Sequence, residues 1–127
     1  MIRLFSLWFM MQLSSLCAQD NYVYVKNYSF LDTEKEISEE RLGELVKYHI
    51  DKSLDYVEIT YELLNTNELQ KVMFQYVPTS YCEKKYYSAG LDLEFTLTLT
   101  DKLVSFQQIP DLRSYYEGRI IGIYFFK

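Results

Sequence analysis

Apolar and polar side chains alternate without a break from Leu91 to Thr100, and this alternation limits the fold more than any other feature. Successive side chains of a β-strand point to opposite faces, so the leucines and Phe95 fall on one face. The acidic residues and threonines fall on the other. Such a strand belongs to a sheet with one face against a core and one face in solvent, which is typical of antiparallel sheets.

Other segments repeat the pattern. Residues 56–64 and 72–76 alternate in the same way, and the polar run Asn65–Glu68 between them predicts a β-hairpin that ends at Pro78. Residues 22–28 and 120–126 predict a first and a last strand. Thirteen tyrosines and eight phenylalanines suit pleated, half-buried surfaces. The predicted core consists of Val57, Ile59, Tyr61, Phe74, Tyr76, Leu93, Phe95 and Leu97.

The segment from Ile37 to Lys52 fits two structures. As a helix it would begin at Ser38 as N-cap and place its apolar residues on one face, but Gly43 would cost about 1 kcal/mol inside it. As a strand it would alternate through Val46, Tyr48 and Ile50. Periodicity leaves both structures open.

A resemblance favours the strand. Three runs resemble segments of secreted bacterial immunoglobulin-like β-sandwich proteins of unknown function, over about residues 22–78. These runs are Ile37-Ser38-Glu39-Glu40-Arg41-Leu42, Tyr56-Val57-Glu58-Ile59-Thr60-Tyr61-Glu62-Leu63-Leu64-Asn65 and Val72-Met73-Phe74-Gln75-Tyr76-Val77-Pro78. The resemblance implies no activity and no functional residue. The expected fold is therefore a mainly β, immunoglobulin-like antiparallel β-sandwich. The alternative is an α+β fold, a sheet packed on one helix at about 38–52 as in cystatins.

The first eighteen residues have the layout of a signal peptide. Arg3 gives a positive start, an apolar run extends from Leu4 to Leu16, and Ala18 is a small residue for cleavage. The apolar run is shorter than the roughly 20 residues that cross a bilayer, which argues against an uncleaved anchor. Lipidation at Cys17 would need a small residue at Leu16. We expect residues 1–18 to be a cleaved signal and 19–127 to be one secreted or periplasmic β-rich domain.

Composition argues against several classes of function. The net charge of −5 and the lack of a basic cluster argue against nucleic-acid binding and against affinity for anionic membrane surfaces, and we expect the mature domain not to be membrane-embedded. His49 is the only histidine, and Cys82 is the only cysteine after the expected signal. These two residues provide neither a nucleophile with its base nor a metal-ligand set. We therefore expect no enzyme activity, no cofactor and no metal site.

Tyrosines provide the only candidate site. Five of them fall in two segments predicted as loops, 79–90 and 107–117, where a core does not require aromatic rings. We expect ligand binding by Tyr81, Tyr86, Tyr87, Tyr115 and Tyr116.

The function expected from these tyrosines is that of a non-enzymatic binding or interaction domain for an unknown protein or glycan. One alternative is a structural or assembly subunit that pairs through an edge strand at 120–126. The other is an α+β domain that resembles protease inhibitors.

Overall fold

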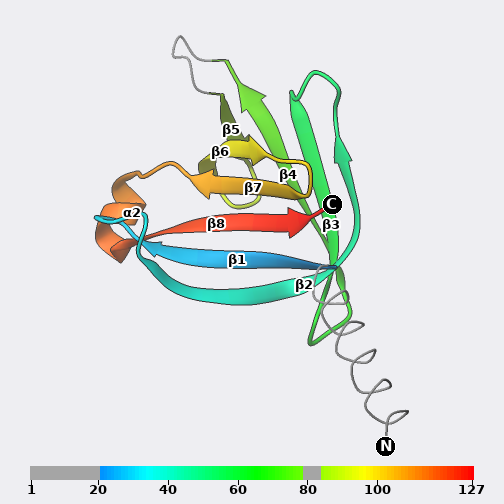
Figure 1. Cartoon of the computed structure of the whole chain (residues 1–127), viewed down its shortest axis with the longest axis horizontal. Helices are drawn as coiled ribbons and strands as arrows, with labels where there is room; N and C mark the ends of the chain where they lie inside the picture. The colour runs from blue at the N-terminus through cyan, green and yellow to red at the C-terminus, as the bar shows by residue number, and fades with distance from the viewer. Residues whose placement is uncertain (1–20, 79–83) are drawn as a thin grey trace, which may run out of the picture.

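The protein is a closed β-barrel. The computed structural model describes residues 21–78 and 84–127, and within them each strand pairs antiparallel with the next, while the last strand returns to the first (Figure 1). The strands are β1 (Tyr22–Ser29), β2 (Glu36–Ile50), β3 (Tyr56–Leu63), β4 (Leu69–Val77), β5 (Lys85–Ser88), β6 (Leu93–Leu99), β7 (Leu103–Gln108) and β8 (Arg119–Phe126). The short helix α2 (Leu112–Glu117) connects β7 to β8.

The predicted sandwich is wrong, because there are not two separate sheets. β8 pairs with β7 on one side and with β1 on the other, as in the partners Val25 and Ile123. An alternating strand has one apolar face that must be buried. The interior of a barrel buries that face as well as the space between the two sheets of a sandwich does. The alternative sheet-and-helix fold is also wrong, since residues 36–50 form β2. The strands and the 56–77 hairpin expected from the sequence are confirmed, except that the strand expected at 91–100 begins only at Leu93, because residues 91 and 92 form a turn.

The long strand β2 bends so that the barrel can close. Its first half pairs with β1 and its second half with β3, and its ladders shift register in three places. Gly43 lies where the halves meet, opposite both Val23 and Leu63. A Cβ at this position would lie 2.1 Å from the Glu62 carbonyl oxygen, so only glycine allows β2 and β3 to approach this closely.

Aromatic rings fill the barrel interior. Phe74 stacks on Phe106 with their ring centroids 3.7 Å apart, and Phe95 meets both rings edge-on. Tyr86 packs edge-on against Phe106 and has no exposed surface. All the predicted core residues belong to this cluster, with Tyr76 and Leu97 only half-buried. The interior of the barrel is therefore a close-packed core.

The short helix α2 lies at one end of the barrel, beside the connection from β1 to β2 (Figure 1). The Phe30 amide of this connection donates to the Gly118 carbonyl at 3.0 Å. Within the described residues no helix has the length and apolar character needed to cross a membrane. The expected signal, residues 1–18, lies outside the part of the chain that the structure describes.

Candidate functional site

Local sequence defines both ends of α2. The Asp111 carboxylate accepts from the Ser114 amide at 3.0 Å, and the Ser114 hydroxyl oxygen accepts from the Asp111 amide at 3.2 Å. This reciprocal capping box starts the helix. Gly118 ends it with φ of 70°, in the left-handed region that glycine tolerates. The Ser114 amide lowers the pKa of Asp111, so this carboxylate is charged at neutral pH.

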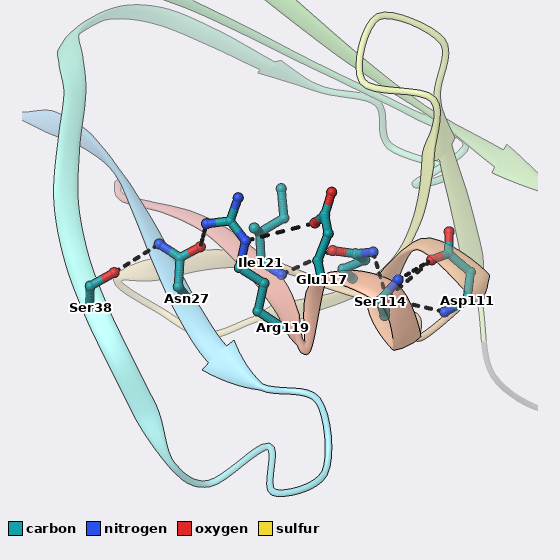
Figure 2. A network of polar contacts seen from close by, with 8 residues as sticks. Asn27, Ser38, Asp111, Ser114, Glu117, Arg119 and Ile121 are labelled. Carbon is teal, nitrogen blue, oxygen red and sulfur yellow. Dashed lines mark hydrogen bonds and ion pairs between the residues drawn. The ribbon is translucent and has the colours of Figure 1, made fainter.

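A buried amide fastens α2 to the barrel wall (Figure 2). Gln108, at the end of β7, donates from Nε2 to the Ser114 hydroxyl at 3.1 Å and accepts from the Ile121 amide at 3.0 Å. Ser114 has no exposed surface and Gln108 is 5% exposed. One side chain therefore joins the helix to β7 and β8 away from solvent, where such bonds hold geometry best.

A second set of contacts runs from the end of α2 across the neighbouring strands (Figure 2). The Arg119 guanidinium lies 3.7 Å from the Glu117 carboxylate and donates to the Asn27 side-chain oxygen at 3.1 Å. Asn27 in turn donates to the Ser38 hydroxyl at 2.9 Å. Residues from α2, β8, β1 and β2 are joined in this way, so α2 rests on a connected polar network.

The opposite side of α2 exposes apolar and aromatic side chains to solvent. Leu112 is 77% exposed, Tyr115 69% and Tyr116 83%. Tyr115 meets Tyr116 edge-on with centroids 5.8 Å apart, and meets Phe30 edge-on at 6.3 Å. We call Phe30, Tyr87, Leu112, Tyr115 and Tyr116 the α2 surface.

Tyr87 joins this surface through polar contacts. Its hydroxyl donates to the Asp92 carboxylate at 2.7 Å, and Asp92 lies 3.8 Å from the Arg113 guanidinium on α2. The hydrogen bond to Asp92 raises the pKa of Tyr87, with burial and nearby carboxylates adding to it, so the hydroxyl stays protonated. Tyr87 and Leu112 line the same hollow of about 390 Å³.

The structure places two of the five predicted tyrosines, Tyr115 and Tyr116, in ring contact, and Tyr87 lines a hollow together with Leu112 of the same helix. Tyr87, Tyr115 and Tyr116 belong to the α2 surface, whereas the Tyr86 ring lies in the core and is unavailable to a ligand. Tyr81 lies outside the described residues. The predicted loops are wrong where β5 occupies 85–88, where β7 extends to Gln108 and where α2 occupies 112–117. In β5 neighbouring side chains alternate faces, which sends Tyr86 inward and Tyr87 outward.

Sequence reasoning missed Phe30 and Leu112 as members of the surface. Leu112 had a detectable signal, since Asp111, Ser114 and Gly118 mark a capped helix in which Leu112 and Tyr116 share a face. Phe30 had none, because its place beside Tyr115 depends on the pairing of β1 with β8.

Several acidic side chains on the strands are paired with cations. Glu58 lies 3.0 Å from Lys71, and Glu94 also pairs with Lys85. The Tyr56 hydroxyl bond to Glu58, together with Lys71, lowers the pKa of this glutamate.

His49 is exposed on β2. Among residues 21–78 and 84–127 no group of three or more His, Cys, Asp or Glu side chains is placed to hold a metal ion.

Comparisons with protein-family models, with curated proteins and with solved structures found no match. The function is therefore inferred from the α2 surface and from the barrel that supports it.

Proposed function

We propose that this protein is a non-enzymatic binding domain that acts outside the cytoplasm and recognises a protein partner through the α2 surface. The observation that carries the proposal is the grouping of exposed Leu112, Tyr115 and Tyr116 on a helix that the barrel holds in place. Large apolar side chains that cluster in solvent are a common mark of an interaction surface.

The composition of the surface favours a protein over a glycan. Leu112 offers an aliphatic side chain that cannot hydrogen-bond to sugar hydroxyls, and Leu31, next to Phe30, is 90% exposed. Tyrosines with few rotatable bonds supply contact area at a low entropic cost. The capping box and the Gln108 bridge order the backbone before binding, which lowers the cost further.

Assembly through an edge strand at 120–126 is not proposed. β8 is hydrogen-bonded to β7 and to β1, so its backbone groups already have partners on both sides. A strand that is paired on both sides cannot add another strand without opening the barrel.

Affinity capture tests the proposal. The immobilised protein is exposed to cell-envelope and culture-medium proteins of its source, and specific captures are compared with those of the double variant Tyr115→Ser/Tyr116→Ser. We expect the double variant to lose affinity by about thirtyfold or more, since even one aromatic residue at the centre of an interface contributes about 2 kcal/mol.

The matched control is Leu69→Ser/Met73→Ser on β4. It also removes two exposed apolar side chains, which are 64% and 48% exposed, but lies outside the α2 surface. Equal capture by both double variants would refute the proposal. Sedimentation velocity provides a second check: a parent dimer that Tyr115→Ser/Tyr116→Ser dissociates would mean that the surface joins copies of this chain instead.

A further inference from the structure

A second concave surface lies on the outside of the barrel wall and shares no residue with the α2 surface. It has a volume of about 460 Å³ and lies over β1, β7 and β8, with one residue from β2. We call it the outer groove. It is lined by Tyr24, Lys26, Tyr28, Glu39, Leu103, Ser105, Tyr124 and Phe126.

Aromatic rings form one wall of the outer groove. Tyr24 and Tyr124 are direct partners across the β1–β8 ladder, and their rings stack with centroids 5.2 Å apart and planes 15° from parallel. Phe126 meets both rings edge-on, at 6.3 and 6.2 Å. Packing among the three rings holds this wall in one arrangement.

A missing side chain at Gly122 leaves room for the ring of Tyr28, which lines the groove. Gly122 lies opposite Lys26 on one side and Gln107 on the other, and a Cβ there would be 3.2 Å from Cε2 of Tyr28. The Tyr28 ring therefore lies against the backbone of β8, in space that a larger residue at 122 would occupy. A side chain at this position would displace the Tyr28 ring from where it lines the groove.

Charged and hydroxyl groups converge on the same surface. The Lys26 Nζ lies 3.4 Å from the Glu36 carboxylate and 3.6 Å from that of Glu39, and 5.1 Å from the centre of the Tyr124 ring. Burial lowers the pKa of Lys26, but Tyr28 and the two glutamates outweigh this and raise it overall. Burial, and then a hydrogen bond to Glu39, raise the pKa of Tyr124. The groove thus presents the Lys26 ammonium, the Glu39 carboxylate and phenolic hydroxyls, with the Glu36 carboxylate beside the ammonium.

We propose that the outer groove binds a neutral sugar ring. A pyranose combines apolar C–H faces with several hydroxyls, and the groove combines aromatic side chains with fixed donors and acceptors. Two carboxylates surround the one ammonium, so a ligand with a phosphate or carboxylate group would meet net repulsion. The charge balance therefore favours a neutral sugar over an anionic one.

Nuclear magnetic resonance titration of the ¹⁵N-labelled protein tests this proposal. The probes are the methyl pyranosides of glucose, galactose and mannose and N-acetylglucosamine, with glucose 6-phosphate and glucuronate as anionic counterparts. At millimolar concentrations, where single sugar rings are expected to bind, at least one neutral sugar should shift the amide signals of Lys26, Ser105 and Gly122. The anionic sugars should bind about tenfold more weakly than the neutral sugars, or more weakly still.

Two variants locate the site. Gly122→Val displaces the ring of Tyr28, a groove residue, and should weaken sugar binding about tenfold or more. Glu39→Gln replaces the charged acceptor of the groove with a neutral amide and should weaken sugar binding similarly. The control Glu44→Gln changes an exposed glutamate of the same strand outside the groove and should leave binding unchanged. Circular dichroism of each variant checks that the barrel is intact.

Three results would overturn the proposal. In the first, none of the sugars shifts the groove amides. In the second, the shifts map to the α2 surface. In the third, p-cresol shifts the groove amides while the sugars do not, which would identify a site for apolar rings. None of these results depends on the protein partner proposed for the α2 surface, so the two proposals succeed or fail separately.

Discussion

At the scale of single residues, neighbours in the chain have opposite roles. Tyr86 points into the core and its hydroxyl donates to the Leu54 carbonyl, whereas Tyr87 points outward to Asp92. Leu54 has φ of 59°, a left-handed conformation that is costly for a leucine, and the Tyr86 bond helps to hold it. The same residue type thus supports a turn in one position and a surface in the next.

We predict that Tyr86→Phe lowers the free energy of unfolding by about 1 kcal/mol, because the Leu54 carbonyl loses its phenolic donor. Tyr87→Phe removes an exposed hydroxyl and should change the free energy of unfolding by no more than about 0.5 kcal/mol. Urea unfolding followed by circular dichroism measures both values. Equal effects of the two variants would contradict the distinction between them.

Gly43 provides a sharper prediction. Gly43→Ala should lower the free energy of unfolding by about 2–3 kcal/mol, because the new methyl group would collide with the Glu62 backbone. Gly90→Ala is the control: a Cβ there meets nothing within 4 Å, so stability should stay within about 0.5 kcal/mol of the parent. Thermal unfolding of the two variants measures the difference in stability. A Gly43→Ala protein as stable as the parent would disprove the close approach of β2 and β3.

At the scale of elements, α2 is too short to be stable alone and depends on its cap and its attachment. Isolated helices need about 12–15 residues, and this one has six. Asp111, Ser114 and Gln108 supply the missing stability by linking the first turn to β7 and β8. The α2 surface therefore depends on residues that do not belong to it.

We predict that Asp111→Ala lowers the free energy of unfolding by about 1 kcal/mol at neutral pH, the usual cost of a lost N-cap. The pKa of Asp111 is lowered in the folded protein, so its contribution is complete above the ordinary pKa of aspartate, about 4, and disappears as the pH falls through the folded value. The difference between the parent and Asp111→Ala should therefore shrink in acid.

Asp111→Asn is the matched variant for this test, because asparagine caps a helix without titrating. Its stability relative to Asp111→Ala should not change with pH over the same range. Urea unfolding at a series of pH values measures all three proteins. A constant difference between the parent and Asp111→Ala down to strongly acidic pH would contradict the role of the charged carboxylate.

At the scale of the whole molecule, closure joins the two ends of the described chain. β1 and β8 pair along their length, from Val23 with Phe125 to Ser29 with Arg119. The core side chains come from all the strands of the barrel, so no part of the wall has a core of its own. The barrel should therefore unfold as one cooperative unit.

Hydrogen exchange checks this cooperativity. We expect the amides of Val25 and Ile123 in the β1–β8 ladder to exchange only by global unfolding, with the same free energy as the amides of Val57 and Phe74 in the β3–β4 ladder. Much faster exchange of the β1–β8 amides would contradict this expectation. It would show that the barrel opens between β1 and β8 while the β3–β4 hairpin stays folded.

The sequence by itself determined five of the strands, β1, β3, β4, β6 and β8, and eight of the side chains that form the core, but it left β2 open and did not show β7. That information is local: the alternation in residues 91–100 exposes one apolar face whatever that face covers. It did not reveal β5, because four residues are too few for a clear period, nor the burial of Tyr86 within it. The capped helix at 112–117 was readable from Asp111 and Gly118, yet the segment was predicted as a loop.

Only the tertiary structure decided between a sandwich and a barrel, and it also determined the α2 surface. Both folds need strands with one apolar face, so the choice rests on whether the first and last strands pair. That pairing depends on the bend of β2 and on the close approach at Gly43, which involve residues far apart in sequence. The meeting of Tyr87 with α2, and of Tyr24 with Tyr124, likewise follows from closure and has no counterpart in any local pattern.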